Sequence, residues 1–190
     1  MERVHLASGS RRRAEMLTGY LRRNVEFTFS RLRAKERPHG HNLPVEEQVL
    51  NTLEGKIEAA QREIEHPYII VADTLVEDPE NPMNALGQPS EIHAAVKMLL
   101  KLSGRRHRVW TGTAIICGDV VRSWVESSIV EVDDLSDEVL ESLVLSGSWR
   151  GKAGGYDLAE SMGQHAAVVD GAECCVLGLA HSALAAIAKD

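Results

Sequence analysis

The sequence predicts an α/β domain built on a mixed β-sheet, and three features lead to this prediction. Apolar residues recur on one face of the segment 45–64, which is the spacing of an amphipathic helix. Residues 68–72 form an uninterrupted apolar run, as expected for a buried central strand. The segments 109–116 and 120–132 flank Gly118-Asp119 and predict a long β-hairpin with a two-residue turn. Because strands alternate with helices and one pair is antiparallel, the sheet should be mixed.

The remaining elements follow from caps, turn residues and short apolar runs. They are strands at 4–7, 25–30 and 166–169, helices capped by Asn42, Ser90 and Ser136, a closing helix at 179–188, and loops at 31–42, 78–89 and 148–165.

Composition limits the kind of protein this can be. The 190 residues are 44% hydrophobic and 26% charged, as in a water-soluble globular domain. No apolar run approaches the roughly 20 residues that cross a bilayer, so no membrane partner is expected. The N-terminus lacks the apolar stretch of a signal peptide. The three cysteines, Cys117, Cys174 and Cys175, form no C-x-x-C pair, which favours reduced, buried thiols in a cytoplasmic protein.

Charge is distributed unevenly along the chain. The first 37 residues hold ten Lys and Arg against four Asp and Glu, whereas the remainder holds eleven against 24. A basic segment on an acidic protein indicates one localised anionic ligand. A nucleic-acid-binding module is the competing interpretation, but aromatic residues make up only 4% of the chain, and stacking platforms for bases are therefore scarce. We expect no nucleic-acid partner.

The first 13 residues point to an anion site. A short strand at 4–7 runs into Ser8-Gly9-Ser10 and then into three arginines at 11–13. This order places backbone N–H groups and two hydroxyls at a helix N-terminus, where anions bind. The helix dipole disfavours cations at that end, so three arginines there indicate that a negative ligand, such as a polyphosphate, docks. The alternative is a solvated run of surface arginines.

Three further residues could take part in chemistry. Lys56 lies on the apolar stripe of its predicted helix, where a lysine either extends outward to solvent or meets an anion. Asp73 directly follows the predicted strand 68–72, where a carboxylate could hold a divalent metal, act as a general base or simply shape a turn. Lys152 opens a glycine-permissive loop in which backbone could approach a phosphate.

Five short segments and one lysine are more informative together than singly, because they occur in a characteristic order along nearly the whole chain. They are Leu6-Ala7-Ser8-Gly9-Ser10-x-Arg12-Arg13, Lys56, Ala72-Asp73-Thr74, Leu86-Gly87-x-Pro89, Leu102-Ser103-Gly104-Arg105-x-His107 and Lys152-Ala153-Gly154-Gly155-Tyr156. This arrangement resembles the Maf family. The resemblance implies one domain over residues 1–190, with a twisted mixed sheet and flanking helices around a central cleft, two lobes being conceivable. The implied fold is related in shape to that of the inosine triphosphatases.

The resemblance also implies an activity and a set of roles. Maf-like proteins split a nucleoside triphosphate into nucleoside monophosphate and pyrophosphate with a divalent metal, Mg²⁺ or Mn²⁺, and a homodimer would be compatible with the family. By position, Ser8, Arg12 and Arg13 would hold the triphosphate, and Lys56 and Lys152 would add phosphate contacts. Glu36 and Asp73 would bind the metal, with base activation of water as the other role for Asp73. Cations, a metal and one carboxylate can supply this chemistry without a covalent intermediate.

The chain departs from the family pattern in several places. Arg11 replaces a proline, Lys35 an acidic residue, Gln88 a lysine, Arg150-Gly151 an acidic position, and Asp157-Leu158-Ala159-Glu160 a Gly-Ile-Gln-Gly stretch near the base site. The last change indicates a base pocket unlike that of the dTTP/UTP-preferring branch, although Ala72-Asp73-Thr74 is more like that branch than like the 7-methyl-GTP branch. These departures leave open a second hypothesis, a Maf-like protein that binds nucleotide with weakened catalysis.

Overall fold

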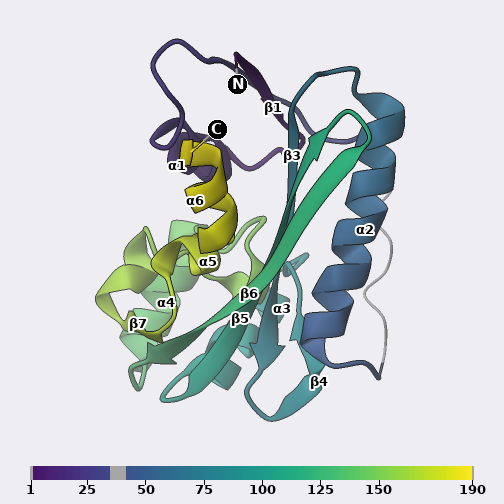
Figure 1. Cartoon of the computed structure of the whole chain (residues 1–190). Helices are drawn as coiled ribbons and strands as arrows, with labels where there is room; N and C mark the ends of the chain where they lie inside the picture. Colours follow the sequence, from purple (N-terminus) through teal and green to yellow (C-terminus); the bar gives the residue numbers. More distant parts are fainter. Residues whose placement is uncertain (1, 35–41, 190) are drawn as a thin grey trace.

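The computed structural model describes residues 2–34 and 42–189 and shows a seven-stranded mixed sheet (Figure 1). The strand order is β2-β1-β3-β5-β6-β7, with β4 paired to β3. The strands are β1 (Arg3–Leu6), β2 (Glu26–Phe29), β3 (Ile69–Asp78), β4 (Asn81–Leu86), β5 (Arg106–Cys117), β6 (Val120–Val132) and β7 (Ala166–Asp170). Strand β1 runs parallel to β2 and β3, and the other pairs are antiparallel, so the predicted mixed sheet is confirmed.

Six α-helices flank this sheet in the described part of the chain. They are α1 (Arg11–Thr18), α2 (Val45–Glu63), α3 (Ile92–Leu102), α4 (Asp137–Ser146), α5 (Glu173–Leu177) and α6 (His181–Lys189). The predicted hairpin is confirmed as β5–β6, which pairs without interruption from Arg106 to Cys117. The segment predicted as a glycine-rich loop, 148–165, holds two 3₁₀ turns, Ala153–Gly155 and Ser161–Gln164.

The two faces of the sheet pack against different helices. Along β5, Gly112 faces α2, because a Cβ at this glycine would lie 3.1 Å from Leu53 Cδ2. Its neighbour Thr111 faces the other way and donates a hydrogen bond from Oγ1 to the Cys175 carbonyl of α5 at 2.7 Å. Successive side chains of a strand leave opposite faces, so this alternation fixes which residues of β3 can reach which helix. Figure 1 shows α2 on one side of the hairpin and α5 and α6 on the other.

Strand β3 is longer than predicted, and this changes the position of Asp73. The strand continues to Asp78, so Asp73 lies in mid-strand opposite Gly112 and does not follow the strand end. The predicted loop at 78–89 was also wrong, because β4 occupies residues 81–86. Pro82 suggested a loop, but β4 pairs only with β3, and an edge strand tolerates a residue that has no N–H to donate.

Two predicted helix caps were wrong and one is confirmed. Pro44, not Asn42, precedes α2, whose first turn is instead supported electrostatically by Glu46 and Glu47. Helix α3 has Glu91 at its N-cap, without a side-chain hydrogen bond, so Ser90 caps nothing. Ser136 does cap α4, where its hydroxyl accepts from the Val139 N–H.

The cysteines are free thiols, as predicted, but they are not all buried. Cys175 is buried and Cys174 half-buried, whereas Cys117 is exposed because it ends β5 beside the hairpin turn. Within residues 2–34 and 42–189, no helix is long and apolar enough to cross a membrane.

Helix α2 should depend on its buried leucine contact with β5. Leu53 is fully buried, whereas Leu50 on the same helix is 40% exposed. We predict that Leu53→Ala lowers the free energy of unfolding by about 2–5 kcal/mol, because it leaves a cavity next to Gly112. The control Leu50→Ala should change it by less than about 0.5 kcal/mol. Urea denaturation followed by circular dichroism measures both values, and equal losses would contradict this packing.

Candidate active site

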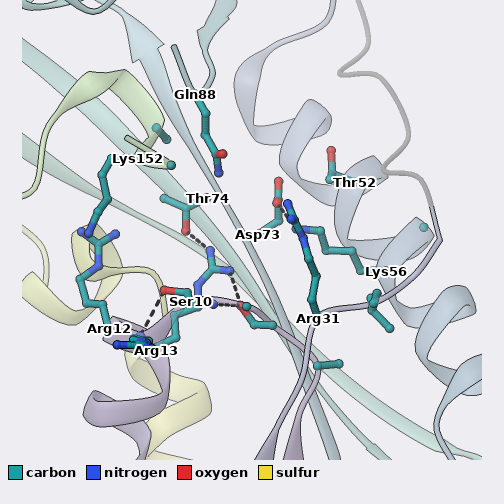
Figure 2. Close-up of a pocket in the computed structure, with 18 of the residues that line it drawn as sticks. Ser10, Arg12, Arg13, Arg31, Thr52, Lys56, Asp73, Thr74, Gln88 and Lys152 are labelled. Carbon is teal, nitrogen blue, oxygen red and sulfur yellow. Dashed lines mark hydrogen bonds and ion pairs between the residues drawn. The ribbon is translucent and has the colours of Figure 1, made fainter. Parts of the chain in front are cut away.

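A cleft of about 1030 Å³ lies between the N-terminal turn, α2, β3 and the loop before Tyr156 (Figure 2). Among its described lining residues, nine are Arg or Lys, and Asp73 is the only acid. The cationic lining residues are Arg11, Arg12, Arg13, Arg31, Arg33, Lys56, Arg62, Arg150 and Lys152. This imbalance of charge favours a polyanionic ligand.

The cleft has two cationic sides with Asp73 between them. In Figure 2, Arg12 and Lys152 lie on one side, and Lys56 and Arg31 lie on the other. The predicted cations and the predicted carboxylate therefore face the same space, and the sequence-based prediction of a single site is consistent with this geometry.

The turn after β1 leads into helix α1, and residues 8–13 of this turn and helix start line the cleft. Ser10 is the N-cap, and its hydroxyl accepts from the Arg13 N–H at 3.3 Å. Ser8 Oγ accepts from the Ser10 N–H at 3.2 Å. No acidic residue occupies the first turn of α1, so the positive end of the helix dipole is not neutralised there by its own sequence.

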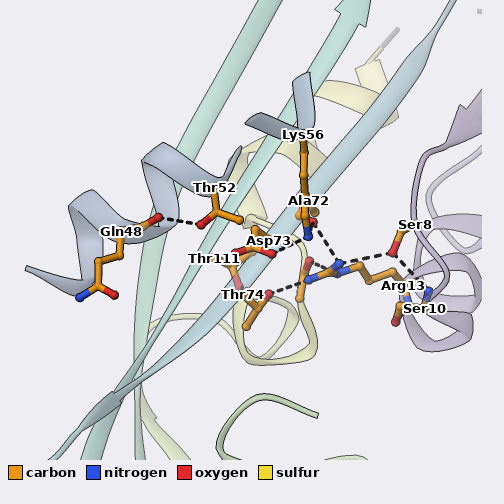
Figure 3. A network of polar contacts seen from close by, with 11 residues as sticks. Ser8, Ser10, Arg13, Gln48, Thr52, Lys56, Ala72, Asp73, Thr74 and Thr111 are labelled. Atoms are coloured by element: carbon orange, nitrogen blue, oxygen red, sulfur yellow. Dashed lines mark hydrogen bonds and ion pairs between the residues drawn. The ribbon is translucent and has the colours of Figure 1, made fainter. Parts of the chain in front are cut away.

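Arg13 connects α1 to the sheet (Figure 3), and it also binds the C-terminal part of the chain. Its Nε donates to the Gly178 carbonyl at 2.8 Å, and its Nη2 donates to Thr74 Oγ1 at 2.9 Å. Its Nη1 donates to the Ala72 carbonyl at 3.1 Å and to Ser8 Oγ at 3.3 Å. Most of the guanidinium donors thus bind protein acceptors, and Arg13 holds the wall of the cleft together.

Lys56 and Asp73 form an ion pair between α2 and β3. Lys56 Nζ lies 2.6 Å from Asp73 Oδ1 and 3.4 Å from the Ala72 carbonyl oxygen. The Asp73 side chain is 9% exposed and the Lys56 side chain 14% exposed. Of the two fates predicted for Lys56, it meets an anion and does not extend into solvent. Asp73 Oδ2 is buried and has no hydrogen-bond partner among the described residues.

Arg12 and Lys152 meet on a second carboxylate, that of Asp157. Arg12 Nη1 lies 2.7 Å from Asp157 Oδ1, and Lys152 Nζ pairs with Asp157 Oδ2. Arg12 Nε also donates to the Leu177 carbonyl at 3.0 Å. Burial alone raises the pKa of Asp157, but its hydrogen bonds and charge interactions with Lys152 and Arg12 outweigh burial and hold that pKa below its usual value.

A buried polar pair is formed by His107 and Tyr156, of which Tyr156 lies next to Asp157 in the chain and lines the cleft. His107 Nε2 and the Tyr156 hydroxyl lie 2.8 Å apart, and both side chains are buried. Burial lowers the pKa of His107 to about 4, so its ring is neutral at pH 7, and burial raises the pKa of Tyr156. Since Tyr156 directly precedes Asp157, the pair fixes the backbone that carries the carboxylate.

Of the site residues predicted from the sequence, all but one fall in the described structure. Ser8, Arg12, Arg13, Lys56, Asp73 and Lys152 all line the cleft. Glu36, predicted to bind metal, lies outside the described residues.

Sequence reasoning missed three arginines and the pairing made by Asp157. Arg31, Arg33 and Arg62 come from the segment after β2 and from the end of α2, and they also line the cleft. The excess of basic residues in the first 37 positions could have indicated Arg31 and Arg33, but nothing in the sequence pointed to Arg62. Asp157 was noted as a departure from the family pattern, but its ion pairs depend on tertiary contacts.

The described residues offer a restricted set of metal ligands. No group of three or more His, Cys, Asp or Glu residues within 2–34 and 42–189 could hold an ion by itself. Mg²⁺, however, is usually held by one or two carboxylates together with substrate phosphates. Asp73 lines the cleft and has one carboxylate oxygen with no hydrogen-bond partner among the described residues, which fits that mode of binding.

Comparison with known proteins identifies the family. A sequence model of the Maf-like protein family matches residues 3–190, nearly the whole chain. The chain belongs to the Maf-like protein family. The resemblance drawn from the five sequence segments and Lys56 is therefore confirmed.

Relatives of this Maf-like chain include three proteins named dTTP/UTP pyrophosphatase. The protein of Pyrococcus furiosus is 41% identical over 47% of this chain, and the match spans only about half of that relative, 46% of its length. The Geobacillus protein is 33% identical over 83% of this chain and 81% of its own length. The Vibrio cholerae protein is 28% identical over 94% and 92%, respectively.

The similarity of this chain to solved structures is weaker than its sequence similarity to these relatives. The Staphylococcus aureus Ham1 protein superposes with a TM-score of 0.46 and 15% identity, covering 70% of this chain and 73% of that one. This similarity is too low to support an inference about function.

Arg13 should contribute to stability more than its neighbour in the first turn of α1. Arg13→Ala leaves the Ala72 and Gly178 carbonyls and Thr74 without a guanidinium donor. We predict a loss of about 3 kcal/mol in the free energy of unfolding, since polar groups lose their partners. Arg11→Ala, at an exposed position, should cost less than about 0.5 kcal/mol. Thermal and urea unfolding measure both changes, and a neutral Arg13→Ala would refute the structural role.

The neutral, buried His107 should make stability depend on pH. Its pKa is about 4 in the folded protein and near 6.5 when unfolded, so between these values the unfolded chain binds the extra proton. Stability is therefore complete above pH 6.5 and falls by roughly 3 kcal/mol on acidification to pH 4. Burial and the charge of His66 also lower the pKa of His5, so His5 likewise destabilises the folded protein as the pH falls.

A pair of variants separates the contribution of His107 from the rest. Urea unfolding between pH 7 and pH 4 should show a shallower pH dependence in His107→Gln, because the titrating ring is gone. The control His93→Gln, at an exposed position, should keep the wild-type slope. An unchanged slope in His107→Gln would show that other groups control the acid sensitivity.

Proposed function

We propose that this Maf-like protein is a nucleoside triphosphate pyrophosphatase, which hydrolyses a nucleoside triphosphate to the monophosphate and pyrophosphate with the help of Mg²⁺ or Mn²⁺. The names of the Geobacillus and Vibrio cholerae relatives support the reaction class and make dTTP and UTP the first substrates to test. Cytoplasmic location, which rests on the cysteine pattern, and assembly as a homodimer, which rests on the family resemblance, are part of the proposal.

The observation that best supports the proposal is the position of Asp73. Its carboxylate is paired on one oxygen with Lys56 and lies in a cleft whose other described charged lining residues are all cations. A hydrolase acting on a phosphoanhydride needs this combination, since charge on the phosphoryl oxygens must be neutralised while a water molecule is oriented.

The triphosphate is proposed to lie along the α1 side of the cleft. The N-terminus of α1 offers backbone N–H groups, and Arg12 and Lys152 add two cations from the same side. Lys56 approaches from α2 on the opposite side. Charge on the three phosphates would then be neutralised from both walls, which also aligns the anhydride bond between the α- and β-phosphates.

Asp73 is the proposed group at the reacting phosphorus. A water molecule attacks the α-phosphorus, the bond from that phosphorus to the bridging oxygen breaks, and pyrophosphate leaves with the bonding electrons. The Asp73 carboxylate would accept the proton of the water through Oδ2, which has no protein partner among the described residues, while Lys56 keeps Oδ1 engaged.

A bound Mg²⁺ or Mn²⁺ would neutralise phosphate charge, held by Asp73 Oδ2 and by Glu36. Metal binding and proton acceptance are the two roles open to Asp73, and both place its unpaired oxygen at the substrate.

Nucleotide binding with weakened turnover is the second candidate function. Gln88 lines the cleft without charge where the family resemblance has a lysine. Asp157 in addition neutralises part of the positive charge of Arg12 and Lys152. Such a protein would show ligand-dependent thermal stabilisation without product.

The decisive assay is pyrophosphate release from a panel of canonical and modified nucleoside triphosphates, with Mg²⁺ or Mn²⁺. We predict turnover that falls about 10³-fold in Asp73→Asn, because that change removes the proton acceptor or metal ligand. Asp119→Asn, which removes an exposed carboxylate in the β5–β6 turn, should retain wild-type activity.

Three results would contradict the proposal. The first is that the folded protein hydrolyses no nucleotide of the panel. The second is that the products are orthophosphate and a nucleoside diphosphate, and the third is that Asp73→Asn keeps full activity. Silence combined with thermal stabilisation by nucleotide would instead support the second candidate.

A further inference from the structure

Asp157 occupies an unusual position relative to the cleft. Its side chain is only 2% exposed and does not line the cleft, whereas Arg12 and Lys152, each 22% exposed, do line it. The carboxylate therefore lies behind the two cations and is shielded by them from a ligand in the cleft.

The carboxylate is saturated by its neighbours. Oδ1 forms an ion pair with Arg12 Nη1 at 2.7 Å and accepts from the Ala159 N–H at 3.1 Å, and Oδ2 accepts from Lys152. A buried carboxylate with these partners is fixed in position, and it fixes the cations in turn. Among the described residues, Arg12 Nη2 has no hydrogen-bond partner, and the Lys152 ammonium has Asp157 as its one partner.

Two cations this close would repel each other without an anion between them. In a low-dielectric wall that repulsion would drive the long side chains apart or out to solvent. A carboxylate bonded to both of them reduces the repulsion and removes side-chain freedom before any ligand arrives. Preorganisation of this kind increases the affinity for a ligand by reducing the entropy lost on binding.

We propose that Asp157 is a positioning residue for substrate, holding Arg12 and Lys152 side by side as a two-cation clamp for the phosphate chain. This inference rests on the proposed function for the identity of the substrate, but the clamp itself is a property of the apo cleft. The proposal gives a function to Asp157, which is one of the residues that depart from the family pattern.

The clamp can be tested by binding, independently of catalysis. Calorimetric titration of the 190-residue protein with inorganic tripolyphosphate should show binding that weakens about tenfold in Asp157→Asn, because the two cations lose the carboxylate that holds them together. Asp157→Ser, whose hydroxyl can still accept from the Ala159 N–H, provides a second variant should the first fail to fold. Glu160→Gln, which removes an exposed acid three residues away, should bind within twofold of wild type.

Two further readouts separate positioning from a general structural defect. In pyrophosphate release, Asp157→Asn should raise KM about tenfold and change kcat less than threefold, since Asp73 and Lys56 are untouched. In a Lys152→Met background, Asp157→Asn should weaken tripolyphosphate binding by only about threefold, because Arg12 alone remains to be oriented. A structural defect would lower kcat and cost the same factor in both backgrounds.

The outcomes discriminate clearly. Equal or tighter tripolyphosphate binding by both Asp157 variants would overturn the proposal, because Asp157 would then be idle or would compete with phosphate for the cations. Failure of the wild-type protein to bind tripolyphosphate would overturn it as well. Wild-type binding that weakens as predicted, combined with no hydrolysis of any nucleotide, would support the clamp while the proposed function fails.

Discussion

A mismatch in strand length creates the site. Strand β1 ends at Leu6, whereas its parallel neighbour β3 continues to Asp78. The carbonyl of Ile70 still pairs with the chain after β1, accepting from the Ala7 N–H, but two residues later the Ala72 carbonyl faces the same side with no strand beside it. Arg13 from α1 and Lys56 from α2 both donate to that oxygen. A buried carbonyl without any hydrogen-bond donor would destabilise the fold. Because this one lacks a strand partner, it accepts from α1 and α2 and so brings the two helices together.

Next to the Ala72 carbonyl, successive side chains of β3 leave opposite faces of the sheet. Asp73 leaves the face that packs on α2 and meets Lys56, whereas Thr74 leaves the other face and meets Arg13 and Thr111. The Lys56–Asp73 pair lies on the α2 side of the cleft, and the Arg13–Thr74 contact connects α1 to the sheet. The described cleft uses two carboxylates, Asp73 inside and Asp157 behind the wall, to order its cations while leaving the lining predominantly positive.

The sequence predicted those parts of the fold that depend on local patterns. The β5–β6 hairpin has long apolar segments around a Gly-Asp turn, and α2 has a continuous apolar stripe, so both were correct. Strand β4 was missed because three prolines and a glycine within residues 78–89 suggest a loop, and only pairing with β3 makes residues 81–86 a strand. Asp73 was predicted to take part in the chemistry, but the expectation that it follows its strand was wrong, since the strand that ends beside it is β1.

Six predicted site residues, found together through their order along the chain, line one cleft in the described structure. Contacts that depend on the tertiary structure could not be predicted in this way. The pairing of Arg12 with Asp157 links α1 to the segment after α4, far away in the sequence, and no spacing rule encodes it.

The central claim, that one cleft holds a triphosphate against Asp73, is most directly tested by a crystal structure with a non-hydrolysable α,β-imido analogue of UTP. We expect its phosphates between Arg12 and Lys152 on one side and Lys56 on the other, with the α-phosphate next to Asp73. Phosphates bound outside this cleft, or a nucleotide whose α-phosphate lies away from the Asp73 carboxylate, would contradict the account.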